Sequence, residues 1–224
     1  MCDDMPRQPE PEYMDDDAEA EAYAVSDFSE VNQTFVDRLL ELVPTRDALT
    51  AVDLGTGPGD IPIRVSRARP AWHITAVDAS EAMLRFGRKA SSEAGVAERI
   101  TWVQADAKDT QLPARTFDVV FSNSILHHIN ETGAFWSELK RLAKPDAWVF
   151  LRDLWRPKSP EDARRIVETY GGVGPELEQE EYYRSLLSAY TLEELRDQLA
   201  QTGLTTLRVE KVTDRHMDVF GRLG

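Results

Sequence analysis

The feature that most constrains the fold is the segment AVDLGTGPGD at residues 51–60, where an apolar run gives way to three closely spaced glycines. The run includes Asp53 and is followed by Gly55, Gly57 and Gly59, after which a helical pattern begins. Where a strand turns sharply into a helix, missing side chains let the backbone approach a ligand closely, and the helix N-terminus favours a carboxylate or phosphate. The segment therefore predicts a strand, a ligand-binding turn and a helix.

Around this turn, apolar β-rich runs alternate with helical patterns, which is the signature of a parallel sheet covered on both faces. The predicted strands cover residues 50–54, 73–78, 100–105, 117–122 and 148–153, with a final pair near 205–212 and 216–220. The predicted helices cover residues 61–69, 80–94, 131–143, 159–170, 176–189 and 191–201, and an N-terminal helix near 18–43 is expected to break around 26–29. The fold class is α/β: a Rossmann-like, seven-stranded, mostly parallel sheet with helices on both faces.

Two of the helix starts are marked by capping signals. Ser159 precedes Pro160 at the first helical position. Thr191 with Glu194 three residues later forms a capping box, and Gly203 supplies the stop for that helix. These signals fix the start of two helices that follow the fifth strand.

The length of 224 residues fits one α/β domain better than two independent cores. We expect a flexible acidic tail and a single domain with an N-terminal helical cap and a helical insertion after the fifth strand. The tail covers residues 1–17 and the domain 18–224, divided into a ligand-binding core at 45–155, a lid insertion at 156–190, and a last helix and strand pair at 191–224. The GGVG sequence at residues 171–174 would allow the lid to move.

The charge balance disfavours nucleic acid as a partner. The formal net charge is −14 at pH 7 and the pI is about 4.7. Such a surface repels phosphate backbones unless a concentrated basic patch overrides it, and the sequence contains no such patch. We expect a small-molecule substrate, no nucleic-acid partner, and a monomer or homodimer.

The N-terminal residues and the cysteine content bear on location. Residues 1–17 contain no apolar run long enough for a signal peptide, and no later stretch could span a bilayer. The lone cysteine, Cys2, excludes an internal disulfide and a cysteine-based metal site. These features predict a cytoplasmic protein with no membrane partner.

Two ligand classes use a glycine-rich turn of this kind. Nicotinamide and flavin cofactors would require glycine at position 60, and that position is Asp60. An acidic residue two positions before the first glycine, with the spacing D-x-G-x-G-x-G, instead resembles motif I of the class I S-adenosylmethionine-dependent methyltransferases. The resemblance extends over roughly residues 51–153 and implies that S-adenosylmethionine is the cofactor. The motif I residues that it implies as cofactor-binding are Asp53, Gly55, Thr56, Gly57 and Gly59.

Further family motifs follow in order. In ITAVDAS, the resemblance places Asp78 where family members hold both ribose hydroxyls, with Ala79 beside it, because a carboxylate can accept two hydroxyl protons at once. Met83 on the next helix turn either packs on the adenine face or belongs to the core. In WVQADAKD, Asp106 falls where the family accepts a hydrogen bond from the adenine amino group, with the Ala107 backbone beside the ring.

The segment TFDVVFSNSILHHI resembles the part of small-molecule methyltransferases that closes the methionine end of the cofactor site. Ser122 and Asn123 end the fourth strand and are assigned to cofactor binding, and Asn123 is expected to face the sulfonium. His127 is a candidate general base, while His128 has a weaker case; both could equally form an ordinary helix entrance. We predict no metal site, because adjacent histidines point in different directions and the sequence offers no partner cluster.

The acceptor side is predicted from residues near the ends of the later strands. Arg152 ends the fifth strand, and Arg215 lies in the turn between the last two strands. If both reach the pocket, they suit an acceptor that bears a carboxylate or similar anion. His127, Asn123 and Arg152 are therefore the candidate catalytic residues. Phe28 and the N-terminal segment around it are expected to fold over the cofactor, as the resemblance implies.

The resulting prediction is an S-adenosylmethionine-dependent methyltransferase that acts on a small, anionic metabolite. Methyl transfer from a sulfonium is an in-line displacement, so the protein mainly aligns the acceptor and excludes water. Two alternatives stay open: a protein- or RNA-modifying methyltransferase, and a noncatalytic protein that binds the cofactor. An RNA-modifying enzyme would need a basic rim, which the composition argues against.

Overall fold

The computed structural model describes residues 5–10, 28–45, 47–171 and 176–224. Its centre is a seven-stranded sheet in the order β3-β2-β1-β4-β5-β7-β6. The strands are β1 Thr50–Leu54, β2 His73–Asp78, β3 Ile100–Gln104, β4 Phe117–Asn123, β5 Ala143–Leu154, β6 Arg208–Lys211 and β7 His216–Arg222. The first five strands are parallel, and β7 runs antiparallel to both β5 and β6. The predicted fold class is confirmed.

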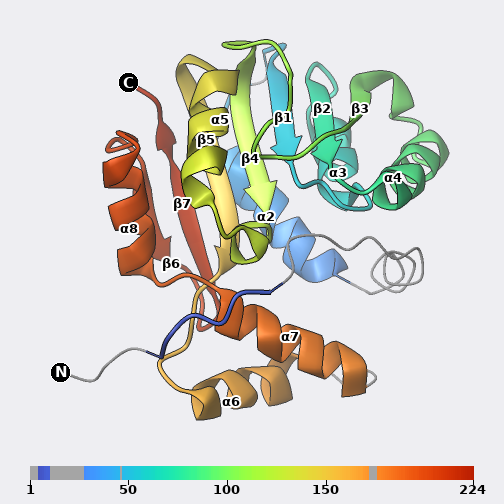
Figure 1. The fold of residues 1–224 in the computed structure, drawn as a ribbon. Helices are drawn as coiled ribbons and strands as arrows, with labels where there is room; N and C mark the ends of the chain where they lie inside the picture. The colour runs from blue at the N-terminus through green and yellow to red at the C-terminus, as the bar shows by residue number, and fades with distance from the viewer. Residues whose placement is uncertain (1–4, 11–27, 46, 172–175) are drawn as a thin grey trace.

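Helices cover both faces of this sheet (Figure 1). They are α2 Ser29–Leu42, α3 Asp60–Ala68, α4 Glu81–Glu93, α5 Thr132–Leu142, α6 Pro160–Tyr170, α7 Glu176–Ser188 and α8 Leu192–Gln201, with short 3₁₀ turns η1 Ala97–Arg99 and η2 Leu126–His128. The first part of the predicted N-terminal helix, residues 18–27, lies outside the described residues. Among the described residues, no helix has both the length and the apolar character needed to cross a membrane.

Alternating residues of β4 explain why the sheet is covered twice. Val119 and Phe121 pack into one buried cluster with Phe35 of α2. Val120, on the opposite face, packs into a second cluster with residues of α5 and α8, among them Trp136. All of these side chains are fully buried. A strand whose successive side chains all enter a core must lie in the middle of a sheet with helices on both sides.

The capping signals occur where the sequence predicts them. The Ser159 hydroxyl accepts a hydrogen bond from the backbone N–H of Asp162, with Pro160 at the start of α6. Thr191 and Glu194 form the reciprocal capping box of α8. The last strand pair is shorter than predicted at its start, because residues 205–207 form a turn before β6. The fifth strand is longer than predicted and begins directly after α5.

Helices α6 and α7 form a separate layer beyond the carboxyl ends of the strands (Figure 1). They enclose a small apolar cluster that includes Ile166 and Leu186 together with Leu154 of β5. Met5 also belongs to this cluster and is buried. The predicted lid insertion is therefore two packed helices, whereas residues 172–175 of the GGVG break lie outside the described residues.

Residues 5–10 fall within the predicted flexible tail over 1–17 but are packed against the domain, whereas residues 1–4 and 11–17 lie outside the described residues. In Figure 1 this dark blue segment runs across α7. The backbone N–H of Gln8 donates to the carbonyl of Leu187 at 3.0 Å, and the Arg7 guanidinium donates to the carbonyls of Ser188 and His127 at 2.6 and 2.9 Å. These contacts tie the N-terminal segment to α7 and η2. The acidic composition of the region gave no sign of this packing.

Candidate active site

A cavity of about 600 Å³ opens at the carboxyl ends of β1, β2 and β4. This is the point where the strand order reverses, because β2 and β4 lie on opposite sides of β1. Open α/β sheets bind their ligands at such a switch point. The lining contains these predicted cofactor residues: Asp53, Gly55, Thr56, Gly57, Asp78, Ala79, Met83, Asp106, Ala107 and Asn123. Four separate sequence motifs therefore meet at one cavity.

The glycine turn of motif I sits against its neighbours with no room for side chains. Gly55 has φ +73°, and a Cβ atom there would overlap Cδ1 of Ile125. Gly59 has φ +84° and begins α3, and a Cβ atom there would overlap the indole ring of Trp102. Gly59 does not line the cavity. The close packing of α3 on β3 therefore explains why residue 59 is a glycine. This corrects the prediction that Gly59 contacts the cofactor.

Asp78 ties the end of β2 to the motif I turn. Its Oδ2 accepts a hydrogen bond from the Gly57 backbone N–H at 2.7 Å, and its Oδ1 accepts one from the Ser80 backbone N–H at 2.9 Å. Burial raises the pKa of this carboxyl above its ordinary value, although the hydrogen bonds oppose the rise. Asp78 is thus a positioned carboxylate at the cavity wall.

Asp53 is the most deeply buried acid of the cavity, with 1% of its surface exposed. Its Oδ2 accepts a hydrogen bond from the Thr56 hydroxyl at 2.7 Å. Burial, aided by the nearby negative charge of Asp78, raises the pKa of Asp53 to about 7. This carboxyl therefore changes charge near neutral pH, in a wall of the cavity where a ligand would feel the change.

The third motif supplies the far wall. Oδ1 of Asp106 accepts a hydrogen bond from the Lys108 backbone N–H at 2.8 Å, and Oδ2 lies 3.2 Å from Nζ of Lys108. Met83 is 5% exposed and lines the cavity while also packing against Ala82. Met83 is thus a buried residue that also lines the cavity, and its packing on an adenine face stays a prediction.

The fourth motif divides between the cavity and the core. Asn123, Ile125 and His128 line one end of the cavity. Ser122 does not, because its hydroxyl is buried and donates to the carbonyl of Leu54 at 2.6 Å. Ser122 thus joins β4 to β1, which corrects its predicted contact with the cofactor. Successive residues of a strand point to opposite faces, so only one of Ser122 and Asn123 faces the cavity.

His127 is buried behind the cavity wall and forms a pair with Asp153. Nδ1 of His127 lies 2.6 Å from Oδ1 of Asp153, whose Oδ2 accepts the backbone N–H of Leu126 at 2.6 Å. Burial lowers the pKa of His127, but the charge and hydrogen bond of Asp153 outweigh it and raise the pKa above the ordinary value. The same pairing lowers the pKa of Asp153 against the effect of burial. His127 itself does not line the cavity.

Arg152 is placed differently from the prediction. Its guanidinium forms a two-pronged pair with Asp218 of β7, at 2.7 and 2.8 Å, and both side chains are buried. Arg152 is not part of the cavity lining, because the antiparallel register of β5 and β7 sets it directly opposite Asp218. The prediction that Arg152 anchors the acceptor is therefore corrected: its charge is committed to a neighbouring strand.

The turn between β6 and β7 does not reach the cavity either. Arg215 donates to the Tyr182 hydroxyl at 3.1 Å and stacks on the ring of Tyr170 at 3.8 Å. Asp214 accepts a hydrogen bond from the Tyr170 hydroxyl at 2.8 Å. These residues join the last strand pair to α6 and α7. The two arginines that suggested an anionic acceptor are thus both engaged elsewhere.

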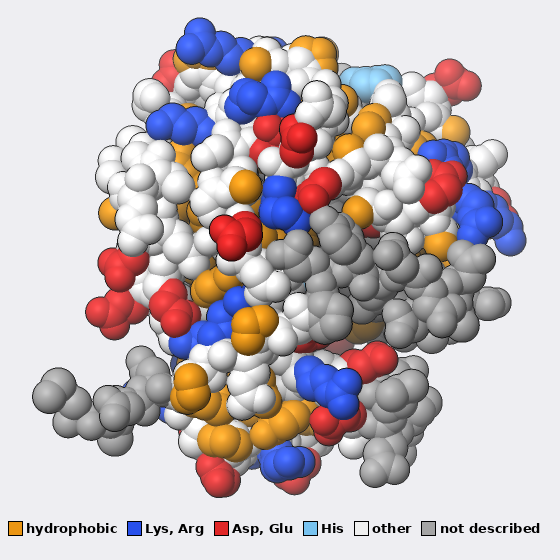
Figure 2. Space-filling view, viewed as in Figure 1, with side chains coloured by type: hydrophobic (Ala, Val, Ile, Leu, Met, Phe, Trp, Pro, Cys, Tyr) orange, Lys and Arg blue, Asp and Glu red, His pale blue; other side chains and the backbone are white. Residues whose placement is uncertain are grey.

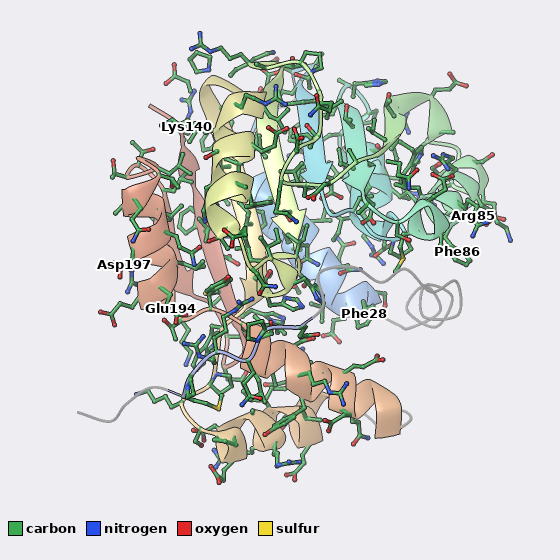
Figure 3. All side chains as sticks on the ribbon, viewed as in Figure 1. Phe28, Arg85, Phe86, Lys140, Glu194 and Asp197 are labelled. Carbon is green, nitrogen blue, oxygen red and sulfur yellow. The ribbon has the colours of Figure 1, made fainter. Side chains whose placement is uncertain are left out.

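Helix α2 adds cavity residues from the N-terminal side. Phe28 and Asn32 line the cavity, and Figure 3 shows Phe28 at the start of α2, beyond the strand ends. The Asn32 side chain donates to Oδ2 of Asp60, the residue that breaks the dinucleotide spacing, at 2.9 Å. Phe28 agrees in position with the prediction that this segment folds over the site. Asn32 was missed, because a polar residue in an amphipathic helix carries no separate signal.

Comparisons with known proteins agree with this geometry. Residues 51–146 match the family model of the methyltransferase domain. The chain is 28% identical over 164 residues to the 27-O-demethylrifamycin SV methyltransferase of Amycolatopsis mediterranei, covering 71% of this chain and 60% of that protein. It is 34% identical over 107 residues to the trans-aconitate 2-methyltransferase of Azoarcus sp., covering 48% of this chain and 40% of that protein. The chain spans about half the length of the curated relatives it matches.

Solved structures share the fold. A S-adenosylmethionine-dependent methyltransferase from Aquifex aeolicus superposes with a TM-score of 0.70 at 20% identity, covering 94% of this chain and all of that one. The phosphoethanolamine N-methyltransferase 2 of Haemonchus contortus superposes with a TM-score of 0.69 at 17% identity, covering 93% of this chain and 57% of that one. The match over residues 51–146, the curated relatives and these structures all support the predicted resemblance to the class I S-adenosylmethionine-dependent methyltransferases. The comparisons agree with the predicted family and with S-adenosylmethionine as its cofactor.

Proposed function

We propose that this chain transfers a methyl group from S-adenosylmethionine to a small-molecule acceptor. The observation that carries the proposal is the single cavity in which motif I, Asp78, Asp106 and Asn123 meet. A volume of about 600 Å³ lies within the range of small-molecule sites in proteins. The names of the relatives that act on a rifamycin and on trans-aconitate support the same class of acceptor.

The cavity residues fit the parts of the cofactor. The glycine turn leaves space for contact between the backbone and the cofactor. Each oxygen of the Asp78 carboxylate already accepts one backbone N–H, from Gly57 or Ser80, and has a further lone pair that can accept from a ribose hydroxyl. Asp106 offers an acceptor for an amino group, next to the apolar surfaces of Met83 and Ala107. The proposed assignment is therefore ribose at Asp78, adenine between Met83 and Asp106, and the methionine end toward Asp53 and Asn123.

The protein's share of the reaction is binding, orientation and exclusion of water. The bound cofactor supplies an activated methyl group, so transfer needs an acceptor lone pair held in line with it. Asn123 and Ile125 form the wall at the proposed methyl end, and Phe28 closes the cavity from α2. No covalent attachment to the protein is required by this scheme.

The acceptor is assigned to the end of the cavity formed by Asn123, His128 and Ile129. Surface charge supports a small molecule over RNA. On the face shown in Figure 2, Lys and Arg side chains alternate with Asp and Glu and do not gather into a basic groove. The net charge of −14 opposes a phosphate backbone in addition.

The test is incubation of the protein with methyl-labelled S-adenosylmethionine and a cell extract separated into small-molecule, protein and RNA fractions. We expect label to enter the small-molecule fraction. The Asp78→Ala variant serves as the matched control, because it should bind the cofactor poorly while keeping the fold. Label that enters protein or RNA instead would contradict the proposed acceptor class.

A further inference from the structure

Three side chains with metal-ligating atoms converge behind the acceptor end of the cavity. They are Glu10 from the N-terminal segment and the adjacent His127 and His128 of η2, and their ligand atoms all lie within 4.8 Å of one another. Oε2 of Glu10 is 3.9 Å from Nδ1 of His128. The two imidazole rings lie next to each other, with centroids 4.1 Å apart and planes inclined by 41°.

We propose that Glu10, His127 and His128 bind a divalent transition-metal ion, with Zn²⁺ the best match. Two imidazole nitrogens and one carboxylate oxygen are the ligand set of a zinc site that keeps its fourth position open. Ligand bonds of about 2.0–2.2 Å put tetrahedral ligand atoms roughly 3.4 Å apart, so separations of up to 4.8 Å must close by up to about 1.4 Å. Small rotations of the Glu10 and His128 side chains would have to provide this movement.

The pairing of His127 with Asp153 is the first independent support. Histidine ligands almost always donate their second ring N–H to a carboxylate, which fixes the tautomer and the ring orientation. The 2.6 Å contact between Nδ1 of His127 and Asp153 leaves Nε2 as the nitrogen that can face an ion. Asp153 is itself held by the backbone N–H groups of Leu126 and Leu154. The orientation of His127 is thus set before any ion arrives.

Glu10 gives the second support. Its Oε1 is buried and has no hydrogen-bond partner among the residues that the structure describes. A carboxylate oxygen removed from water without a donor costs free energy, and such atoms are usually satisfied by a partner or an ion. Oε2 of the same carboxylate is the oxygen that lies 3.9 Å from Nδ1 of His128, so a cation bound by both Glu10 oxygens would give Oε1 the partner that it lacks.

Contacts of the N-terminal segment hold Glu10 in place. Its backbone N–H donates to the Ser188 hydroxyl at 3.3 Å, and Gln8 is hydrogen-bonded to α7 two residues earlier. Met5 anchors the same segment in the apolar cluster under α7. The carboxylate therefore belongs to a packed strap across α7 and η2, which makes it available as a fixed ligand.

The charges around the cluster also accommodate a cation. The positive charge of the nearby Arg7 guanidinium disfavours a bound cation. This guanidinium, however, donates to the carbonyls of His127 and Ser188 and lies over the Tyr190 ring at 4.2 Å. The Arg184 guanidinium also acts on the Glu10 carboxyl, and Glu10 and Asp153 supply two carboxylates to the cluster. A divalent ion coordinated by neutral imidazoles thus enters a site with compensating negative charge.

His128 lines the cavity, so the open position of the ion would face the acceptor end. That placement rests on the proposed methyltransferase function, whereas the binding of the ion does not. An acceptor with an oxygen donor would then be held on the ion. Coordination occupies the nitrogen of His127 that a general base would use, so His127 acts as a ligand in this arrangement.

The experiment uses untagged full-length protein, freed of metal with a chelator, because a histidine tag would bind the probe. Zn²⁺ is titrated by calorimetry, and Co²⁺ is titrated in parallel to record the absorption bands of a low-coordinate site. We expect one ion per chain. Glu10→Gln and His128→Asn should each weaken binding at least tenfold. His73→Asn is the matched control, because His73 is exposed on β2 and bonded to Thr101, and it should bind the ion as the wild type does.

Absence of one-to-one binding to the wild type, or equal binding by all three variants, would overturn the metal site. Thermal unfolding of each variant must first show a folded chain, and Glu10→Gln is nearly isosteric, so it keeps the test informative. A titration with S-adenosylmethionine in the same preparations separates the two proposals. In the wild type, failure to bind the metal while S-adenosylmethionine still binds contradicts the metal site, whereas failure to bind S-adenosylmethionine while the metal still binds contradicts the proposed function.

Discussion

At the scale of single residues, Asp78 has both a structural contact and a proposed contact with the cofactor. It holds the Gly57 N–H and faces the cavity. We predict that Asp78→Ala weakens S-adenosylmethionine binding at least tenfold, because hydrogen bonds to a charged acceptor contribute about 1.5–3 kcal/mol each. Calorimetric titration measures the affinity, and far-ultraviolet dichroism checks the fold. Asp78→Asn should lose less, since it keeps one acceptor oxygen. Unchanged affinity in Asp78→Ala would rule out the ribose assignment.

Asp53 makes the cavity sensitive to pH. Its pKa of about 7 in the folded chain means that the ionised fraction grows as the pH rises from 6 to 8. The cofactor carries a sulfonium and an ammonium group, so it should bind more tightly to the ionised form. We predict that affinity increases over this pH range and that binding below pH 7 releases a proton, measured by calorimetry in buffers of different ionisation enthalpy. Asp53→Asn should remove most of this dependence; a dependence that persists there would assign it to another group.

The same group affects stability with the opposite sign. The folded-state pKa of Asp53 is raised from 3.8 to about 7, so the folded chain holds this proton more tightly than the unfolded chain does. The contribution to stability is complete below pH 3.8 and is lost as the pH rises through about 7. Without cofactor, Asp53→Asn should therefore gain stability relative to the wild type as the pH rises from 5 to 8. Urea unfolding at several pH values measures this difference, and a constant difference would contradict the assignment.

At the scale of elements, the Arg152–Asp218 pair links β5 to β7, the fifth and sixth strands in the order of the sheet. Both side chains are buried and bonded twice to each other. We predict that Arg152→Ala destabilises the chain by about 3–5 kcal/mol, because the buried Asp218 carboxylate then keeps only the more distant Arg38, at 3.9 Å, as a cationic neighbour. Thermal or urea unfolding measures the loss. Replacing both partners with apolar residues, as in Arg152→Met with Asp218→Leu, should restore much of it. If Arg152→Ala is as stable as the wild type but has a raised acceptor KM, the result would contradict this prediction and support a role of Arg152 in binding the acceptor.

The motif I turn also gives a specific prediction, which concerns the effect of a side chain at Gly57 on cofactor binding. Gly57 has φ +55° and lines the cavity. A valine there meets both a backbone conformation that β-branched residues avoid and the space that a ligand needs. Gly57→Val should abolish cofactor binding while the far-ultraviolet dichroism stays near that of the wild type. If this variant binds S-adenosylmethionine normally, the turn is not part of the cofactor site.

At the scale of the whole molecule, the sequence predicts what the order of parallel strands places together. Gly55, Asp78, Asp106 and Asn123 follow four different strands, and all four line one cavity because the carboxyl ends of parallel strands meet at one edge of the sheet. Strand periodicity also predicts the buried faces of β4. Local sequence patterns are therefore sufficient to predict the parts of the fold that are built from repeated strand–helix–strand connections.

The parts that could not be predicted depend on contacts between distant segments. The partner of Arg152 follows from the antiparallel register of β5 and β7, which no local pattern determines. Glu10 reaches His127 only because the N-terminal segment packs on α7, and the polar sequence around it resembles a solvated tail. The role of Arg152 and the packing of the N-terminal segment were therefore both missed. They concern the proposed acceptor end of the cavity, near which the late strands, the helical insertion and the N-terminal segment meet.

The central claim is that the cavity at the switch point is a site for S-adenosylmethionine. The most direct measurement is calorimetric titration of the full chain with S-adenosylmethionine and, separately, with NAD, at pH 8 where Asp53 is ionised. We predict saturable binding of one S-adenosylmethionine per chain and no heat of binding from NAD, because the glycine spacing that NAD requires is interrupted by Asp60. Binding of NAD in its place, or no binding of S-adenosylmethionine by a chain that is folded at that pH, would contradict it.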